Sequence, residues 1–196
     1  CLHIGDGELL IVSFGGSLGA ERMNEVCLSV MKHFSLSMPK IRHIHACGRR
    51  YYETIADEYP SLCRENGRVR VVPYIDNMPV LLSAADMAVC RAGAATIAEL
   101  AATATPSVLI PSPHVTDDHQ TKNAKRAEDT GGCVLLSEDA LTEETLTREI
   151  KKILRSTSLR AHMRAGIHTL YDPKTDEKIA NEILGCIRMS KRVSLP

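Results

Sequence analysis

Three stretches of the sequence carry the residues whose types and spacing could do chemistry. The first, Gly15-Gly16-Ser17-Leu18-Gly19, follows the apolar run at 9–12. Glycine has no Cβ, so its backbone can turn sharply or approach a ligand closely. Where such a turn opens a helix, free N–H groups and the helix dipole point at one spot and can bind a phosphate. A tight turn with no ligand is the alternative for this stretch taken alone.

The second stretch, residues 90–99, reads CRAGAATIAE and again places a glycine before a predicted helix. Backbone N–H groups at 94–96 could hold a second part of a phosphate group. Glu99 could accept hydrogen bonds from two neighbouring ribose hydroxyls, because both oxygens of a carboxylate are acceptors. The structural alternative for Glu99 is a carboxylate stabilised by the helix dipole.

The third stretch begins the predicted helix at 119–129 with His119, Gln120 and Asn123. Imidazole and amide groups both donate and accept hydrogen bonds, and sugar hydroxyls need both. Asp118 precedes the helix and is predicted to cap it. A polar helix start that faces water is the alternative.

Other cofactor patterns do not fit these stretches. The first is not G-x-G-x-x-G, the second predicted strand ends without an acidic residue, and no Lys-Ser/Thr follows Gly19, so NAD and nucleoside triphosphates are disfavoured. His43 and His45 share one face of an apolar strand and are interpreted as core, since no cysteine or carboxylate spacing completes a metal site. We therefore expect neither a metal nor another cofactor.

Composition narrows the class of protein further. The chain has 196 residues, with 24 Lys+Arg balancing 24 Asp+Glu, and nucleic-acid binding would need a basic excess. Its seven cysteines include no C-x-x-C pair, which favours a reducing compartment over a disulfide framework. No apolar run reaches the roughly 20 residues of a membrane span, and the start lacks a signal-peptide pattern. We expect a cytoplasmic location.

Short apolar runs alternate with helical patterns along the whole chain. Such alternation predicts one doubly wound, Rossmann-like α/β domain over residues 1–196, with a parallel sheet covered on both faces. Ligands bind such sheets outside the carboxyl ends of the strands, where the stretches described above lie. Strands are predicted near 9–14, 41–47, 69–73, 86–90, 107–111 and 133–136, and helices near 19–34, 50–58, 78–84, 94–103, 119–129, 142–155, 158–168 and 175–188.

Taken together, these stretches resemble the MurG family of glycosyltransferases, which add N-acetylglucosamine to the lipid-linked muramyl-pentapeptide precursor of peptidoglycan. The order and spacing of the shared motifs hold over nearly the whole chain, but they cover only the C-terminal half of that family. The motifs are GGSLGA at 15–20, HACG at 45–48, YIDNM at 74–78, ADMAVCRAGAATIAEL at 85–100, PSVLIPSP at 106–113 and DDHQTKNA at 117–124.

The resemblance implies a metal-free site for UDP-N-acetylglucosamine in the second Rossmann-like domain of a two-domain GT-B enzyme. It assigns the diphosphate to both glycine turns, the uracil edge to the backbone of YIDNM, the ribose diol to Glu99 and the sugar hydroxyls to the third stretch. The implied contact residues are Gly16, Ser17, Ile75, Ala94, Ala95, Thr96, Glu99, His119, Gln120 and Asn123.

The resemblance also implies what must come from elsewhere. The family's N-terminal domain carries the acceptor loops and the catalytic base, and no residue of this chain matches that base. The expected partners are therefore the donor sugar nucleotide, an N-terminal acceptor domain, and the membrane-borne acceptor held by that domain. A UDP-N-acetylglucosamine 2-epimerase-like domain and a non-catalytic sugar-nucleotide-binding subunit are the alternatives. One departure from the family is Ala104, where a glycine is usual.

Overall fold

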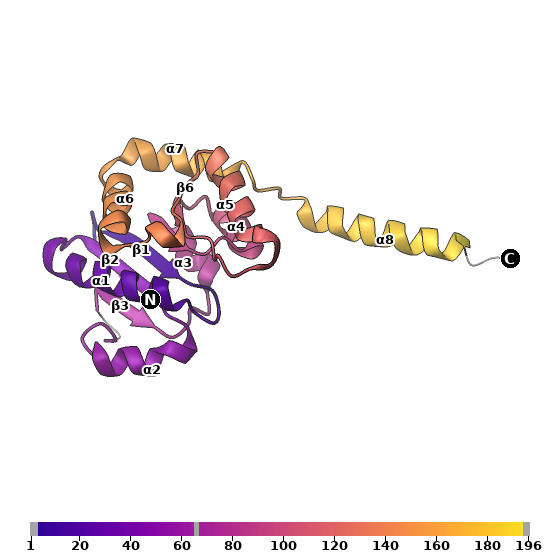
Figure 1. The fold of residues 1–196 in the computed structure, drawn as a ribbon. Helices are drawn as coiled ribbons and strands as arrows, with labels where there is room; N and C mark the ends of the chain where they lie inside the picture. Colours follow the sequence, from indigo (N-terminus) through magenta and orange to yellow (C-terminus); the bar gives the residue numbers. More distant parts are fainter. Residues whose placement is uncertain (1–3, 65–66, 194–196) are drawn as a thin grey trace.

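Six short strands form one parallel sheet in the computed structural model, which describes residues 4–64 and 67–193 (Figure 1). Strands buried on both faces need apolar residues at nearly every position, which explains their continuous apolar runs. The doubly wound parallel sheet predicted from the sequence is confirmed. The strands are β1 (Leu9–Phe14), β2 (Ile41–Ala46), β3 (Val69–Val72), β4 (Met87–Cys90), β5 (Ser107–Leu109) and β6 (Cys133–Leu135), in the order β3-β2-β1-β4-β5-β6.

Helices connect successive strands and cover both faces of the sheet (Figure 1). In β1, Leu10 and Val12 pack with α3, α4 and α5, whereas Ile11 packs with α1 and α6. The helices are α1 (Glu21–Ser37), α2 (Arg49–Glu58), α3 (Met78–Ala84), α4 (Ala94–Thr103), α5 (His119–Asp129), α6 (Glu143–Arg155), α7 (Thr157–His168) and α8 (Thr175–Val193), with short 3₁₀ turns η1 (Thr116–Asp118) and η2 (Glu138–Ala140).

The order of the strands reverses at β1. This strand pairs with β2 on one side and with β4 on the other, and Phe14 and Cys90 face each other at the ends of β1 and β4. Gly15 and Arg91 therefore leave the sheet side by side. Such a reversal is the topological switch point at which doubly wound sheets bind ligands.

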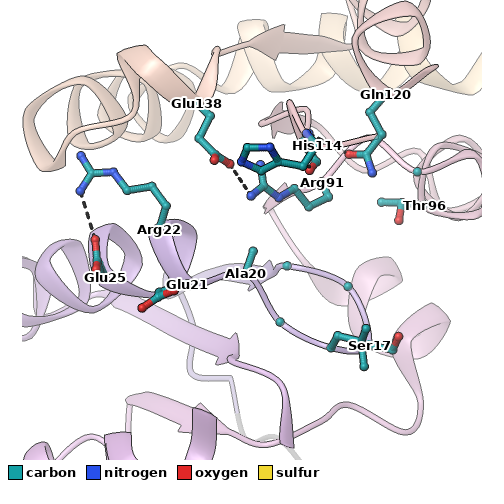
Figure 2. A pocket seen from close by; sticks show the side chains of 16 residues that line it. Ser17, Ala20, Glu21, Arg22, Glu25, Arg91, Thr96, His114, Gln120 and Glu138 are labelled. Carbon is teal, nitrogen blue, oxygen red and sulfur yellow. Dashed lines mark hydrogen bonds and ion pairs between the residues drawn. The ribbon is translucent and has the colours of Figure 1, made fainter. Parts of the chain in front are cut away.

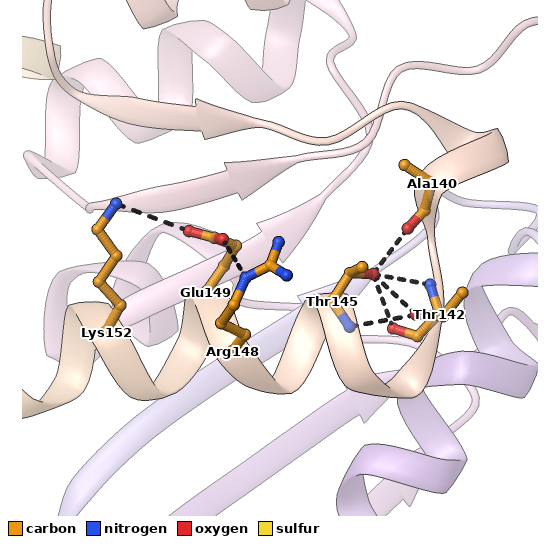
Figure 3. A network of polar contacts seen from close by, with 6 residues as sticks. All are labelled: Ala140, Thr142, Thr145, Arg148, Glu149 and Lys152. Atoms are coloured by element: carbon orange, nitrogen blue, oxygen red, sulfur yellow. Dashed lines mark hydrogen bonds and ion pairs between the residues drawn. The ribbon is translucent and has the colours of Figure 1, made fainter.

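Four helix starts, those of α1, α2, α6 and α7, differ from the sequence prediction by one or two residues, and those of α1 and α6 have a clear local cause. α1 begins at Glu21 rather than near residue 19, because Gly19 has a φ of +77° and Ala20 is extended. α6 begins at Glu143, because Thr142 precedes it as a capping box, in which the Thr142 side chain accepts from the Thr145 backbone N–H and the Thr145 side chain accepts in return (Figure 3). The same Thr145 hydroxyl donates to the carbonyl of Ala140, which ties η2 to the start of α6.

The last helix, α8, extends away from the sheet and its covering helices (Figure 1). Its apolar side chains recur at helical spacing and are about half exposed, as at Ile179, Ile183 and Ile187. An exposed apolar stripe of this kind indicates a surface that packs against something else. Among the helices of the described residues, none is both long and apolar enough to cross a membrane.

Candidate functional site

The turn between β1 and α1 requires glycine for two separate reasons. Gly16 and Gly19 have φ values of +92° and +77°, a backbone region that side chains with a Cβ rarely adopt. A Cβ on Gly19 would also lie 2.0 Å from the carbonyl oxygen of Cys47. The turn is thus pressed against the backbone that follows β2, and the tight packing fixes its shape.

A chain of buried polar side chains holds that backbone in place. Asn24, on the second turn of α1, donates from Nδ2 to the Cys47 carbonyl at 3.0 Å, and its Oδ1 lies 3.0 Å from His45 Nε2. His45 Nδ1 and His43 Nε2 each lie 2.8 Å from the Ser13 hydroxyl oxygen. Ser13, Asn24 and both histidines are at most 3% exposed.

If both imidazoles are neutral, the direction of each hydrogen bond in this buried network follows from the Cys47 carbonyl at its end. The Cys47 carbonyl can only accept, so the Asn24 oxygen faces His45 and the Nε2 of His45 must donate to it. His45 Nδ1 then accepts the Ser13 proton, and the Ser13 oxygen accepts from Nε2 of His43. With both imidazoles neutral, as their burial favours, each carries its proton on Nε2.

Burial keeps these two histidines uncharged. It lowers the pKa of His43 to about 3, with a further lowering from His45, and it lowers the pKa of His45 to about 4. The interpretation of both residues as core is confirmed by their burial. Within the described residues, no group of three His, Cys, Asp or Glu side chains is placed to hold a metal ion.

The second glycine turn carries β4 into α4. Gly93 precedes Ala94, the first residue of α4. The N–H groups at 94–96 have no partner within the helix and are free for a ligand. Arg91 donates to the carbonyls of Ile110 and Pro111 at 3.2 and 3.1 Å. It also forms an ion pair with Glu138.

Glu99 lies on the second turn of α4 and is partly buried. Burial raises its pKa above the ordinary 4.5 of a glutamate. Its position is beyond the first turn, where the helix dipole acts most strongly, so the dipole alternative for this carboxylate is weak. A carboxylate kept partly out of water without a structural partner of its own fits a group that meets a ligand.

The third stretch departs from one expectation. Asp118 does not cap α5: its φ is +51°, no side-chain cap bond forms, and its carboxylate accepts the Thr121 hydroxyl at 2.5 Å instead. Gln120 Oε1 accepts from the Ser112 backbone N–H at 3.0 Å. Asn123 donates to the carbonyl of Ala92 at 3.1 Å, and His119 lies 2.9 Å from the carbonyl of Thr116 through Nδ1.

A cavity of about 660 Å³ lies between the first glycine turn and the two loops that face it (Figure 2). Figure 2 shows Ser17 on one side, with Thr96, Gln120 and Arg91 on the other. Four residues of the predicted set line the cavity, namely Gly16, Ser17, Thr96 and Gln120. The other six, Ile75, Ala94, Ala95, Glu99, His119 and Asn123, are not among its lining residues.

Arg91 and Glu138 are among the lining residues that were not predicted as site residues. Arg91 lies inside the CRAGAAT stretch, where a charged side chain directly after an apolar strand was a usable signal in the sequence. Glu138 follows β6 in a different part of the chain, and only the fold brings it to Arg91. His114 and Ser112 line the same wall from the proline-rich loop after β5.

The sheet order and the two glycine turns at its switch point define a Rossmann-like α/β domain with a ligand cavity at the carboxyl edge. Residues 10–181 match the family model described as the glycosyltransferase family 28 C-terminal domain. The chain belongs to this family.

Curated relatives carry one name, UDP-N-acetylglucosamine–N-acetylmuramyl-(pentapeptide) pyrophosphoryl-undecaprenol N-acetylglucosamine transferase. The protein from Carboxydothermus hydrogenoformans is 43% identical over 79% of this chain and 41% of its own length. The protein from Symbiobacterium thermophilum is 35% identical over 97% of this chain and 50% of its own length. The chain thus spans about half the length of these relatives.

A solved structure is similar as well. The crystal structure of Acinetobacter baumannii MurG superimposes with a TM-score of 0.78 at 30% identity, covering 92% of this chain and 51% of that one. The fold is therefore that of one Rossmann-like half of a GT-B glycosyltransferase.

Proposed function

We propose that residues 1–196 form the donor-binding domain of an inverting glycosyltransferase that takes N-acetylglucosamine from UDP-N-acetylglucosamine. The observation that carries this proposal is the pairing of Phe14 with Cys90, which sets two glycine turns and two helix starts around one cavity. Two helix N-termini that converge at a single point suit a diphosphate. The names of the relatives support the choice of donor.

Each predicted residue has a place in this proposal. Ser17 and the amides around Gly16 contact the diphosphate from one side, and Ala94, Ala95 and Thr96 contact it from the other. Backbone groups of Ile75 meet the uracil, and Glu99 accepts both ribose hydroxyls. His119, Gln120 and Asn123 meet the sugar, with Gln120 nearest to the cavity.

The chemistry of the donor half is charge stabilisation. When the sugar is transferred, negative charge develops on the departing UDP, and fixed N–H dipoles at the starts of α1 and α4 stabilise it without reorganising. The proposal needs no metal for this step. The base that deprotonates the acceptor hydroxyl, and the surface that holds the acceptor, lie in the part of the relatives that this chain does not span.

The relatives' names also suggest the acceptor and the setting. We propose that the acceptor is the lipid-linked muramyl-pentapeptide, and that a separate N-terminal acceptor domain brings it to this one. The domain itself would then work in the cytoplasm, at the inner face of the membrane that carries the acceptor. The exposed apolar stripe of α8 offers a surface on which the acceptor half could pack.

Calorimetric titration of the chain with UDP, UDP-N-acetylglucosamine and NAD, in the presence of a chelator, tests the donor assignment. Both uridine nucleotides are expected to bind, with modest affinity because one domain alone leaves much of the ligand exposed. Binding that requires Mg²⁺ or Mn²⁺, or a preference for NAD, contradicts the proposal.

A further inference from the structure

We propose that Arg91 is a positioning residue that orients Gln120 toward the sugar of the donor. The inference rests on the proposed function, because it concerns which group of the donor Gln120 meets. Arg91 acts through the backbone of the loop after β5, and Glu138 holds its other side. None of these contacts requires Arg91 to touch the ligand.

Arg91 is held by three partners at once. Its guanidinium donates to the carbonyls of Ile110 and Pro111 and pairs with the carboxylate of Glu138. The Arg91 side chain is 12% exposed and that of Glu138 is 17% exposed, so both charges are largely out of water. A planar guanidinium can bridge several acceptors in fixed directions, which an ammonium group cannot do.

The Glu138 side of this contact is itself fixed. Glu138 begins η2, and the end of that turn is tied to α6 by the Thr145 hydroxyl, which donates to the Ala140 carbonyl at 2.7 Å. Arg22 donates to the next carbonyl, that of Leu141, at 3.0 Å. The carboxylate therefore gives Arg91 a rigid support rather than a mobile partner.

The loop that Arg91 holds determines the orientation of Gln120. Pro111, whose carbonyl accepts from Arg91, is followed directly by Ser112, whose N–H donates to Gln120 Oε1 at 3.0 Å. A backbone N–H can only pair with the oxygen of the amide, so this bond fixes which end of the amide faces the cavity. Because Oε1 is turned toward Ser112, the NH₂ group of Gln120 is the end of the amide that is left to meet the ligand (Figure 2).

The consequence is a defined preference in the sugar part of the site. An amide that turns its NH₂ group to the cavity favours an acceptor oxygen on the sugar, and Ser112 keeps it in that orientation. Arg91 should therefore affect the difference in affinity between UDP-N-acetylglucosamine and UDP, and leave the affinity for UDP itself unchanged. Because Glu138 balances its charge, we expect Arg91 to contribute little to binding of the diphosphate.

The test measures that added affinity by titrating variants with UDP and with UDP-N-acetylglucosamine. Arg91→Lys keeps the charge but cannot span three partners, and Arg91→Gln removes it. Both are expected to weaken UDP-N-acetylglucosamine binding about 3- to 10-fold, the size of one lost hydrogen bond, while UDP binding stays the same. Gln120→Ala should give a loss of the same kind, and adding Arg91→Lys to it should cause no further loss.

Arg164→Gln is the matched control. Arg164 also bridges two backbone carbonyls, those of Ala104 and Ala85, but it is not among the residues that line the cavity. Its loss should lower the melting temperature and leave the sugar contribution intact. If the losses of affinity in Arg91→Lys/Gln120→Ala are additive, or if UDP and UDP-N-acetylglucosamine lose affinity equally, the role of Arg91 is overturned but the proposed function is not. Failure of the unmodified chain to bind either nucleotide overturns the proposed function and this inference together.

Discussion

Glu99 is the residue on which the assignment to a ribose depends. Replacing it by Gln keeps its size, removes the charge and turns one acceptor into a donor, so UDP binding is expected to weaken by about 1–3 kcal/mol. The melting temperature should change little, because a partly buried neutral amide needs no ion partner. Titration calorimetry and thermal unfolding measure the two effects. Unchanged binding with a lower melting temperature would show that Glu99 is structural.

The raised pKa of Glu99 adds a pH dependence to that assignment. Its ionised form accepts the ribose hydroxyls, so affinity should decline as pH falls toward a pKa that lies above 4.5. UDP-N-acetylglucosamine suits this titration because its diphosphate has no terminal phosphate group that titrates nearby. The Gln variant should lose this decline, whereas Asn123→Ala should keep it.

How far single residues could be predicted depends on how local their signals are. Gly16, Gly19 and Glu99 stand inside short stretches whose chemistry can be inferred without a fold. The Arg91–Glu138 pair could not be predicted, because the two residues follow different strands and meet only through the sheet order. The positive φ of Asp118, which prevents the predicted cap, depends on packing in η1 that has no sequence signature.

At the scale of elements, the pair of buried histidines on β2 predicts a specific loss of stability in acid. Their folded pKa values of about 3 and 4 lie below the 6.5 of a free histidine. Below pH 6.5 the unfolded chain therefore takes up two protons that the folded chain does not. The contribution of the two histidines to stability is fully present above that pH. It falls as the pH drops toward about 4 for His45 and about 3 for His43, by roughly 1.4 kcal/mol per pH unit for each.

Urea unfolding at several pH values measures that slope. His43→Gln should reduce it by about half, since one of the two groups is removed. His43 is the better choice because its Nδ1 is buried without a hydrogen-bond partner in the described structure, so the substitution costs less than at His45. A slope that does not change in the variant contradicts the neutral, buried state of these imidazoles.

The end of α4 offers a second prediction at this scale. Ala104 has a φ of +50° and a ψ of +45°, a left-handed conformation that costs a residue with a Cβ more than it costs glycine. Ala104→Gly is expected to stabilise the domain by about 0.5–1 kcal/mol. Ala98→Gly, at an exposed position in the same helix, should destabilise it by about 1 kcal/mol. Thermal and urea unfolding of both variants check the pair.

The elements themselves were largely predictable from the sequence. Strands buried on both faces give continuous apolar runs, so all six were located, and β1 was predicted with its observed ends. Helix starts that depend on tertiary packing were harder to predict from the sequence. The start of α1 shifts to Glu21 because Gly19 packs against Cys47, a contact between the loops that follow β1 and β2.

For the whole molecule, we expect that the chain alone does not transfer sugar. In our proposal its cavity residues serve the donor, and the part of the relatives that it does not span supplies the base and the acceptor surface. General acid–base help contributes about 10²–10⁴-fold, and positioning of the acceptor can contribute more. Incubation with UDP-N-acetylglucosamine and the lipid-linked acceptor, with and without a separately made N-terminal domain, tests this. Transfer by the chain alone, abolished in His119→Ala, would contradict it.

The central claim is that both glycine turns bind one diphosphate at the switch point of the sheet. Two-dimensional amide NMR of the ¹⁵N-labelled chain, titrated with UDP-N-acetylglucosamine and no metal, tests it most directly. We expect the largest chemical-shift changes to fall together on the amides of residues 15–20 and 93–96, with one common affinity. Shifts confined to one of the two turns, or centred on another face of the domain, would contradict it.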